Sequence, residues 1–417
     1  MVGEFIMNKN RKAALRGAIL LLYLLVAGFQ QQTKISADAE LKMKANDLAQ
    51  KYMIVDTHLD VPYRLNKKME DISRRTAGGD FDYPRAIEGG LNAIFMAVYV
   101  PPEYEEEGGS RVLADKQINM IEGFAESWPG KFVMARSAAD VKKQFCNNRI
   151  SLAMGIENGA PIEGDLNNLR YFYERGVRYI TLVHSKNNHI CDSSFDEGPK
   201  WNGLSPFGMK VVSEMNRLGM IVDVSHISDK AFYQIMEISK APVVATHSSC
   251  RFFTPGWERN MDDEMIKLLA KKGGVIQINF GSMFVNTQVN REYINRKKQT
   301  MDYIKTHNLK GKEQEKYIKE YTRNNPLGDA DISDVVANID HVVQLVGMDH
   351  VGLGSDFDGV GDNLPYGLKD VSCYPNLIYE LLKKGYTEED INKIFSDNFL
   401  NVWLDVEKTA LELQSGS

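Results

Sequence analysis

The sequence predicts an α/β fold, a (β/α)8 barrel of the TIM type. Eight short apolar segments rich in valine and isoleucine alternate with longer amphipathic segments. Runs that are apolar throughout are typical of strands buried on both faces, as in a parallel sheet. Eight such strands separated by helices indicate a barrel rather than an open sheet. The length of 417 residues and the 43% apolar content are sufficient for one large domain of this kind.

The barrel elements follow one another in regular order. The predicted strands are residues 53–58, 91–100, 150–156, 177–183, 220–225, 242–246, 274–280 and 350–355. Pieces of buried helix are the alternative, but the shortness of the runs and their valine and isoleucine content favour strands. The amphipathic segments between them have the helical period. The predicted helices are residues 33–52, 111–127, 166–175, 206–218, 228–239, 261–272 and 333–347, with two packed helices in 374–403. Residues 64–90 are polar and glycine-rich, which predicts a long loop after the first strand.

Residues 287–330 interrupt this rhythm between the seventh and eighth predicted strands. They are strongly charged and have a helical pattern. We expect a helical insertion on the surface of a single domain that covers residues 33–417. A lid or an oligomer contact is the alternative, because loops on the carboxyl side of barrel strands shape active sites.

The amino-terminal residues 1–32 are interpreted as a signal peptide. Lys9, Arg11, Lys12 and Arg16 precede the apolar run 17–29, and this order is typical of an export signal. An uncleaved membrane anchor is the alternative, although the run is short for a transmembrane helix. The first six residues are read as a cloning remnant. We therefore expect an exported protein, in the bacterial periplasm or cell envelope.

The net charge bears on nucleic-acid binding, and the cysteine pattern bears on disulfide bonds. The formal net charge is −6, and no basic cluster interleaved with aromatic residues is present, so a nucleic-acid partner is not expected. The four cysteines are scattered without a CxxC motif. Free or buried thiols are the simpler interpretation, although an exported protein could pair two of them.

Residues suited to metal binding recur at the ends of the predicted strands. In a parallel barrel these ends meet on one face, where catalytic groups gather. A lone histidine at a strand end is more often structural, but the set as a whole favours a metal centre. The set comprises His58, Asp60, Glu157, His184, His226, His247 and Asp356.

The order of these residues predicts two ions. His58 and Asp60 are two positions apart, so in an extended segment they face the same side and can hold one ion. His226 and His247 end two further strands and can hold a second. Glu157 can bridge two ions about 3.5–4 Å apart, which would share a hydroxide and turn it into a nucleophile. Imidazole with carboxylate suits Zn²⁺ or a similar divalent ion.

A carboxylate is also available for proton transfer. Asp356 follows the eighth predicted strand in the glycine-rich segment LGSDFDGV, where the backbone can come close to the site. We expect Asp356 to accept a proton and to return it to the leaving group. Asp358 is the competing choice in the same segment.

Several longer motifs resemble the membrane dipeptidase (renal dipeptidase) family of the amidohydrolase superfamily. They span residues 53–403, and the SPFG…VDVSH and SDFDG blocks are the most specific. The matching segments are VDTHLDVP, GIENG, ITLVHSKNN, GLSPFGMKVVSEMNRLGMIVDVSHIS, APVVATHSS, RNMDDEMIKLL, VGLGSDFDGV and YPNLIYELLKKGYTEEDINKIFSDNFLNVW.

The resemblance implies a binuclear zinc dipeptidase on a (β/α)8 barrel, with two Zn²⁺ ions and a homodimer as expectations. It assigns His58 and Asp60 to one zinc, His226 and His247 to the other, and Glu157 to both. His184 would contact the substrate and stabilise the oxyanion, and Asp356 would lie beside the same substrate. Arg259 would bind the substrate's free carboxylate through its planar guanidinium, with Arg251 as the competitor.

This chain departs from the mammalian pattern at two places. The insertion 287–330 is longer than the mammalian connection, and Phe284 stands where mammalian members carry tyrosine. Both departures bear on substrate preference and not on the metal chemistry. Another metal-dependent amidohydrolase (a lactonase, β-lactam hydrolase or deaminase) is the alternative function, and Arg259 separates the two because only a substrate with a carboxylate uses it. A non-catalytic barrel protein is disfavoured because all five metal ligands are present.

Overall fold

The computed structural model describes residues 36–145 and 149–416. The chain divides into two compact units, Met1–Lys44 and Ala45–Ser417. The described part of the first unit is the beginning of helix α2 (Ala37–Lys51), and the second unit holds every strand. Residues 1–32, for which a signal peptide is predicted, lie outside the described residues. Within the described residues, no helix combines the length and apolarity needed to cross a membrane.

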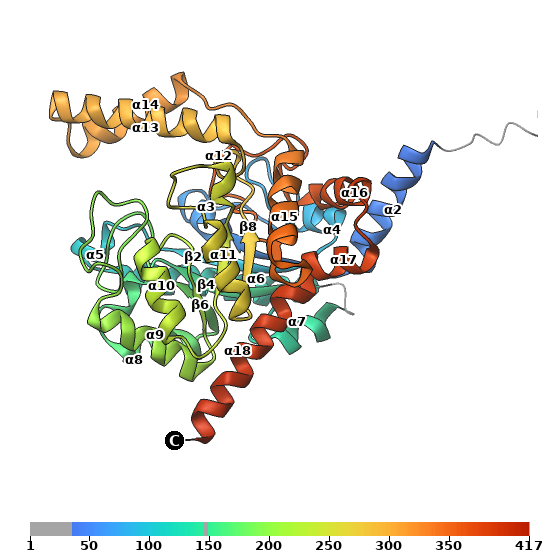
Figure 1. Cartoon of the computed structure of the whole chain (residues 1–417), viewed down its shortest axis with the longest axis horizontal. Coiled ribbons are helices and arrows are strands. Elements are labelled where there is room, and N and C mark those ends of the chain that lie inside the picture. The colour runs from blue at the N-terminus through green and yellow to red at the C-terminus, as the bar shows by residue number, and fades with distance from the viewer. Residues whose placement is uncertain (1–35, 146–148, 417) are drawn as a thin grey trace, which may run out of the picture. The chain divides into compact units, whose positions relative to one another are not determined.

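Eight parallel strands of the second unit form a nearly closed barrel (Figure 1). Each neighbour in the order is hydrogen-bonded to the next, and β1 meets the segment that follows β9 through a bridge between Leu59 and Phe357. The predicted fold class is therefore confirmed, with all eight predicted strands in place. In barrel order the strands are β1 (Ile54–Leu59), β2 (Leu91–Tyr99), β4 (Ile150–Glu157), β5 (Val177–Thr181), β6 (Ile221–Asp223), β7 (Val244–Ser248), β8 (Val275–Ile278) and β9 (Val351–Leu353).

One further strand was not predicted. β3 (Phe132–Met134) pairs in parallel with β4 outside the barrel path. Three residues are too few to show a strand pattern in the sequence. Because β3 adds one to the count, the insertion predicted between the seventh and eighth strands lies between β8 and β9.

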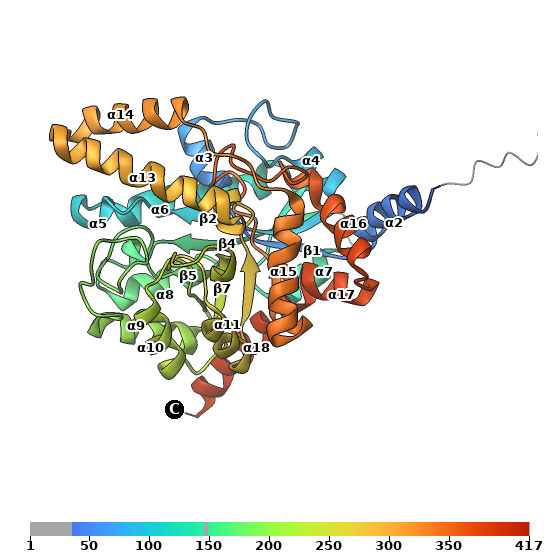
Figure 2. The same ribbon diagram turned by 45° about the horizontal axis from the view of Figure 1, so that its top comes forward.

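Helices surround the barrel where the amphipathic segments predicted them (Figures 1 and 2). Several begin at a side chain that accepts a hydrogen bond from the backbone of the first turn, as Ser205 does from Gly208 N and Asp262 from Met265 N. The main helices of this layer are α6 (Ser110–Ser127), α8 (Leu166–Glu174), α9 (Pro206–Leu218), α10 (Asp229–Ile238), α11 (Asp263–Lys271) and α15 (Ile332–Val346).

Several shorter helices connect or flank these elements. They are α5 (Tyr104–Glu107), α7 (Ala138–Phe145), α12 (Ser282–Val285), α16 (Tyr374–Lys384) and α17 (Glu388–Asn392). Single 3₁₀ turns lie at Ala160–Ile162, Arg251–Phe253, Met348–His350 and Val371–Cys373, and a π-helical turn lies at Lys393–Asp397.

The loop predicted at 64–90 is wrong at both ends. Helix α3 (Val61–Lys67) and helix α4 (Tyr83–Gly89) occupy them, which leaves a connection of about fifteen residues. Both helices carry proline in the first turn, where its fixed backbone angle suits a helix. Asp82 caps α4 by accepting a hydrogen bond from Arg85 N at 2.9 Å. The glycines and polar residues between α3 and α4 mask the helical character of both segments in the sequence.

The barrel interior changes from apolar to polar along the strands. At the amino ends, inward residues such as Phe95, Tyr179 and Val244 pack against helix α18 (Asn398–Ser415) in one buried cluster. Trp403 of α18 is fully buried there and closes that end of the barrel. Toward the carboxyl ends the buried inward residues are polar: Thr57, Glu157, Thr181, Asp223, Thr246 and Asn279. These polar side chains of the barrel interior therefore lie at the carboxyl ends of the strands.

The insertion is a pair of helices, α13 (Thr287–His307) and α14 (Gly311–Asn324). They lie side by side and extend away from the barrel (Figure 2). Asn286 caps α13 by accepting hydrogen bonds from Gln288 N and Val289 N, and Val289 and Asn290 are buried against the barrel side. The first turns of α13 are therefore fixed near the carboxyl ends of the strands.

Candidate metal centre

The predicted ligands converge at the carboxyl end of the barrel. The possible ligand atoms form three groups, and within each group all of these atoms lie within 4.8 Å of one another. The groups are His58 with Glu157 and His247, Glu157 with His184 and His226, and His58 with Asp60 and Asp356. Two of these residues have left-handed backbones, His226 with φ 68° and Asp356 with φ 63°. Such a conformation is costly for residues other than glycine and is often found at functional sites.

Glu157 occupies the middle of this cluster. Its Oε1 lies 3.2 Å from both His226 Nε2 and His247 Nε2, and these two nitrogens are 2.9 Å apart. Its Oε2 lies 3.6 Å from His58 Nε2. The two oxygens of one carboxylate thus face different histidine sets.

His58 and Asp60 meet as predicted, although not for the predicted reason. His58 Nε2 lies 3.4 Å from Asp60 Oδ2. Asp60 is no longer in an extended segment, since it stands at the start of α3 with φ −86° and ψ 27°. The β1–β2 register is irregular between Asp56 and Leu59, and Asp56 accepts a hydrogen bond from His58 N at 3.1 Å. A local bend, rather than strand alternation, brings the two side chains together.

The donor set fits divalent metal ions. A tetrahedral ion with bonds of about 2.05 Å separates its ligand atoms by about 3.3 Å, close to the spacings around Glu157. His58 Nε2 is buried and has no hydrogen-bond partner among the described residues. Thr246 Oγ1 donates to Asp223 at 2.6 Å, so it accepts from His247 Nδ1 at 2.8 Å. This tautomer leaves the lone pair of His247 Nε2 directed at the site.

Burial and neighbouring charges set the protonation of these groups. Burial lowers the pKa of His226 well below its usual value, and burial with the nearby His58 lowers the pKa of His247 to about 3. Burial alone would raise the pKa of Glu157, but the surrounding histidines lower it well below its usual value. Burial raises the pKa of Asp356 to about 6. His226 and His247 as neutral imidazoles beside an ionised Glu157 are in the forms that bind metal. His58 differs: burial lowers its pKa, but the neighbouring Tyr179 and Glu157 outweigh burial and raise the pKa well above its usual value.

The structure separates the two candidate aspartates after β9. Asp356 lines the cavity, and its Oδ2 accepts a hydrogen bond from Asn279 Nδ2 at 2.7 Å. Asp358 does not line it, because its carboxylate pairs with Arg64 Nε at 2.9 Å. Gly359 allows this arrangement, since any Cβ there would overlap the carboxylates of Asp60 and Asp356.

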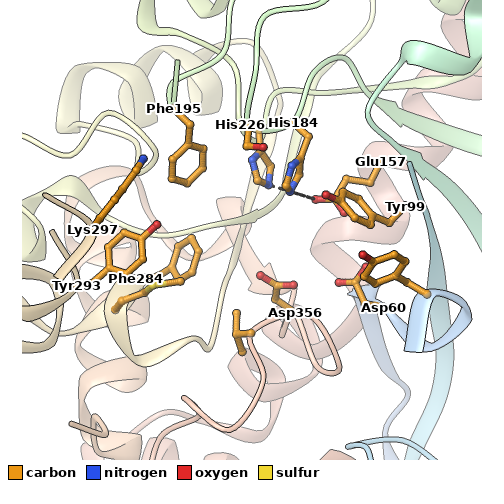
Figure 3. A pocket seen from close by; sticks show the side chains of 15 residues that line it. Asp60, Tyr99, Glu157, His184, Phe195, His226, Phe284, Tyr293, Lys297 and Asp356 are labelled. Atoms are coloured by element: carbon orange, nitrogen blue, oxygen red, sulfur yellow. Dashed lines mark ion pairs between the residues drawn. The ribbon is translucent and has the colours of Figure 1, made fainter. Parts of the chain in front are cut away.

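A cavity of about 540 Å³ opens beside the cluster (Figure 3). His184 lies at its wall with Nε2 3.7 Å from Glu157 Oε1, and its ring packs 4.7 Å from that of Tyr99. Burial lowers the pKa of His184. The remaining lining residues are Asp60, Tyr63, Ser185, Phe195, His226, Met283, Phe284, Tyr293, Lys297, Asp356, Gly359 and Val360.

Arg259 lies next to the cluster but behind the cavity wall. Its guanidinium donates to Ser248 Oγ and to His247 O, both at 2.8 Å, and stands 5.1 Å over the Phe284 ring. Its Nε is buried without a hydrogen-bond partner among the described residues, and burial lowers the pKa of Arg259 to about 10. The competitor Arg251 points elsewhere, since it pairs with Asp229.

Sequence reasoning missed two kinds of site residue. Asp223, Tyr179 and Asn279 hold the predicted residues in place, and their signal was a polar side chain inside an apolar strand segment. Tyr293 and Lys297 line the cavity from the insertion, where no strand end marked them. Their only signal was a spacing of four residues on one helix.

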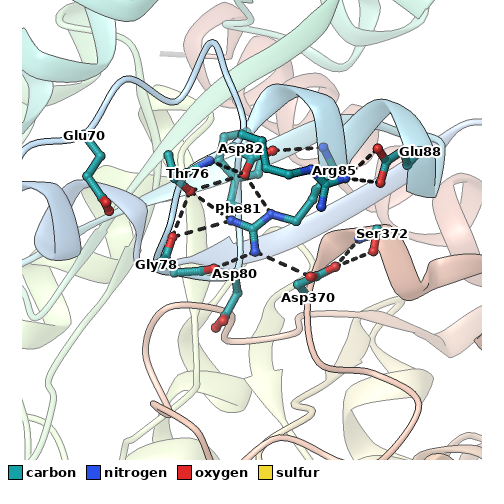
Figure 4. A network of polar contacts seen from close by, with 12 residues as sticks. Glu70, Thr76, Gly78, Asp80, Phe81, Asp82, Arg85, Glu88, Asp370 and Ser372 are labelled. Carbon is teal, nitrogen blue, oxygen red and sulfur yellow. Dashed lines mark hydrogen bonds and ion pairs between the residues drawn. The ribbon is translucent and has the colours of Figure 1, made fainter.

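A buried ion-pair network supports the segment before α4 (Figure 4). Arg85 Nε pairs with Asp82 Oδ2 at 2.7 Å, and Nη1 donates to Gly79 O at 2.6 Å and reaches Asp370 Oδ2 at 3.4 Å. This fixes Asp80, whose backbone N donates to Asp358 Oδ1 at 2.7 Å while Asp358 N donates back to Asp80 Oδ2 at 2.8 Å. The network therefore holds the turn that carries Asp356.

Replacing Arg85 with methionine is expected to destabilise the protein by about 3 kcal/mol, because it leaves a buried carboxylate unpaired. The side chains of Arg85 and Asp82 are 9% and 0% exposed. The control is Arg75→Met, whose pair with Glu88 is 55% exposed on both sides and should cost under about 1 kcal/mol. Unfolding in urea measures both variants, and equal losses would contradict the assignment.

Fold and site together define a class: a barrel hydrolase whose strand ends assemble histidines and carboxylates for metal ions. Residues 42–417 match the family described as membrane dipeptidase (peptidase family M19). The chain belongs to this family of metallodipeptidases, as the motif resemblance predicted.

Curated relatives agree with this placement, and solved structures share the fold. Dipeptidase tcpJ of Claviceps purpurea is 34% identical over 339 residues, which cover 80% of this chain and 70% of the relative. Dipeptidase aclJ of Aspergillus oryzae is 35% identical over 342 residues, covering 80% and 72%. The crystal structure of the probable dipeptidase PvdM from Pseudomonas aeruginosa has a TM-score of 0.79 and 26% identity, covering 89% and 99%. A metallo peptidase from Rhodobacter sphaeroides, crystallised with a phosphinate mimic of the dipeptide L-Ala-D-Ala, has a TM-score of 0.70 at 24% identity, covering 85% and 99%, and shows the same fold.

Proposed function

We propose that this protein is a binuclear zinc dipeptidase that hydrolyses dipeptides with a free C-terminal carboxylate. One observation supports this most directly: Glu157 turns one oxygen toward His226 and His247 and the other toward His58. We assign His58 and Asp60 to one ion, His226 and His247 to the other, and Glu157 to both. Two such ions would acidify water and polarise the scissile carbonyl.

Side chains of the protein would stabilise the oxyanion and transfer the proton. His184 reaches the cavity beside Glu157 and can donate a hydrogen bond to the oxyanion that forms at the attacked carbonyl. Asp356 points into the cavity between the histidine side and Asp60 (Figure 3). There it can take a proton from the attacking water and return it to the leaving amine. Asn279 holds the Asp356 carboxylate in that orientation.

The carboxylate of the substrate is assigned to Arg259. Its guanidinium lies behind the cavity wall, against His247 and above Phe284, and its Nε has no partner among the described residues. A small shift of Phe284 would let an anion reach it. Because this contact needs a free carboxylate close to the ions, only short peptides would satisfy both. The cavity size suits a substrate of that size.

Metal analysis and a substrate panel test the proposal. The purified protein should contain about two zinc ions per chain and should cleave dipeptides but not their C-terminal amides. Chelation should abolish the activity, and zinc should restore it. Equal cleavage of the amides would contradict the role of Arg259, and activity that survives removal of both ions would contradict the metal centre.

Two further expectations remain predictions. The homodimer implied by the motif resemblance is not tested by a single chain. Export to the bacterial periplasm depends on residues 1–32, which lie outside the described residues.

The described cysteines Cys191, Cys250 and Cys373 are free thiols, and Cys146 lies outside the described residues.

A further inference from the structure

The insertion helix α13 forms part of the cavity wall. Tyr293 and Lys297 are four residues apart, so they lie on one face of the helix, and both line the cavity. The same face begins with Val289, which is buried at the base of α13. Figure 3 shows the two side chains across the cavity from Glu157 and Asp60. The insertion therefore faces any substrate held at the metal centre.

Lys297 brings a positive charge to this wall. Its Nζ lies 5.2 Å from the centre of the Phe195 ring. The carboxylates of Glu197 and Asp196 attract it, but neither forms an ion pair with it among the described residues. It is the one lysine or arginine among the described residues that line the cavity. The carboxylates of the lining, Asp60, Glu157 and Asp356, lie on the metal side and would be neutralised by the ions. An anion in the cavity would then find Lys297 as its cationic partner.

Tyr293 adds a hydrogen-bond donor beside this charge. Its ring packs 5.7 Å from Trp257, which holds the side chain in place. No hydrogen bond to its hydroxyl exists among the described residues, and Figure 3 shows that hydroxyl turned toward the cavity. A phenol O–H and an ammonium on one helix face are a suitable pair of donors for a carboxylate.

We propose that Lys297 and Tyr293 form a subsite for an acidic side chain of the substrate, so that dipeptides containing aspartate or glutamate are preferred. This inference rests on the proposed dipeptidase function. It differs from the assignment of Arg259, which would bind the main-chain carboxylate common to all dipeptides. The subsite belongs to the insertion, so it is a property of this chain's longer connection and not of the metal centre.

The test compares substrates that differ by one charge. Ala-Glu is paired with Ala-Gln, and Glu-Ala with Gln-Ala, so each pair keeps its shape while the side-chain carboxylate is lost. For at least one pair, the wild-type kcat/KM should favour the glutamate dipeptide by about tenfold, the effect expected of a charge-assisted hydrogen bond. Added salt should reduce this preference.

Variants of α13 test whether the preference for glutamate dipeptides arises from Lys297 and Tyr293. Lys297→Gln should bring the ratio close to one by lowering kcat/KM for the glutamate dipeptide alone. Tyr293→Phe should reduce the ratio by a smaller factor. The matched control is Lys298→Gln, which removes a charge from the next residue, an exposed one that does not line the cavity, and should keep the wild-type ratio.

Two results would overturn the subsite. One is a wild-type ratio near one for both pairs while the dipeptides are cleaved, which leaves the dipeptidase proposal intact. The other is an equal fall for glutamate and glutamine dipeptides in Lys297→Gln, which would indicate a general effect on the pocket. Failure of the zinc-loaded wild type to cleave any of the four dipeptides would overturn the function and the subsite together.

Discussion

Replacing Glu157 with glutamine is expected to remove most of the bound metal and to lower kcat/KM by about a thousandfold or more. The oxygens of this carboxylate approach His58 on one side and His226 with His247 on the other. An amide keeps a single acceptor oxygen and turns an N–H₂ donor toward the opposite histidine set. Loss of the activated water and of the polarised carbonyl costs several kcal/mol, and each 1.4 kcal/mol is a factor of ten.

Metal content and activity should be measured on the same preparation of the Glu157 variant. Zinc per chain after gel filtration should fall from about two to below one. The control is Glu174→Gln on α8, an exposed carboxylate remote from the cavity, which should retain zinc and activity. Retention of two ions with wild-type affinity would show that Glu157 does not bridge, and the two halves of the site would then be independent.

Replacing Asp356 with asparagine is expected to lower kcat by about 10²–10⁴-fold, the usual contribution of general acid–base catalysis, while zinc content stays at its wild-type value. Asparagine has nearly the same shape and can still accept the hydrogen bond from Asn279, so the turn after β9 should persist. It cannot take up a proton from water. The effect should therefore appear in kcat, with KM changed little.

The control for Asp356 lies in the same segment of the chain. Asp362→Asn removes an exposed carboxylate that does not line the catalytic cavity, and it should leave kcat near the wild-type value. Single-turnover measurements at saturating dipeptide would separate the chemical step from product release. Near-normal turnover by the Asp356 variant with full zinc content would refute its role in proton transfer.

Much of the fold was predictable because strands and helices of a barrel carry different local patterns. The apolar runs that became β1, β4 and β7 are buried on both faces. The wrong predictions also have causes in the local sequence. β3 is only three residues long, and the starts of α3 and α4 were hidden by surrounding polar residues although Pro62 and Pro84 mark their first turns.

The site residues were predictable in kind because parallel strands end on one face, which made a list of strand-end histidines and carboxylates meaningful. Their exact contacts were not predictable. Asp356 and Asp358 compete within one segment of the sequence, and the pairing of Asp358 with Arg64 removes Asp358 from the cavity. Arg259 and Arg251 were likewise both available, and the ion pair with Asp229 holds Arg251 away.

The sequence by itself determined the barrel, the end of the barrel that carries chemistry, and the residue types that suit divalent metal ions. These follow from periodicity and from the order of residues along the chain. Only the tertiary structure decided that Glu157 faces both histidine sets, that a bend in the backbone joins His58 to Asp60, and that Lys297 of the insertion reaches the cavity. Such relations join segments that are far apart in sequence, and they depend on packing, which no local pattern encodes.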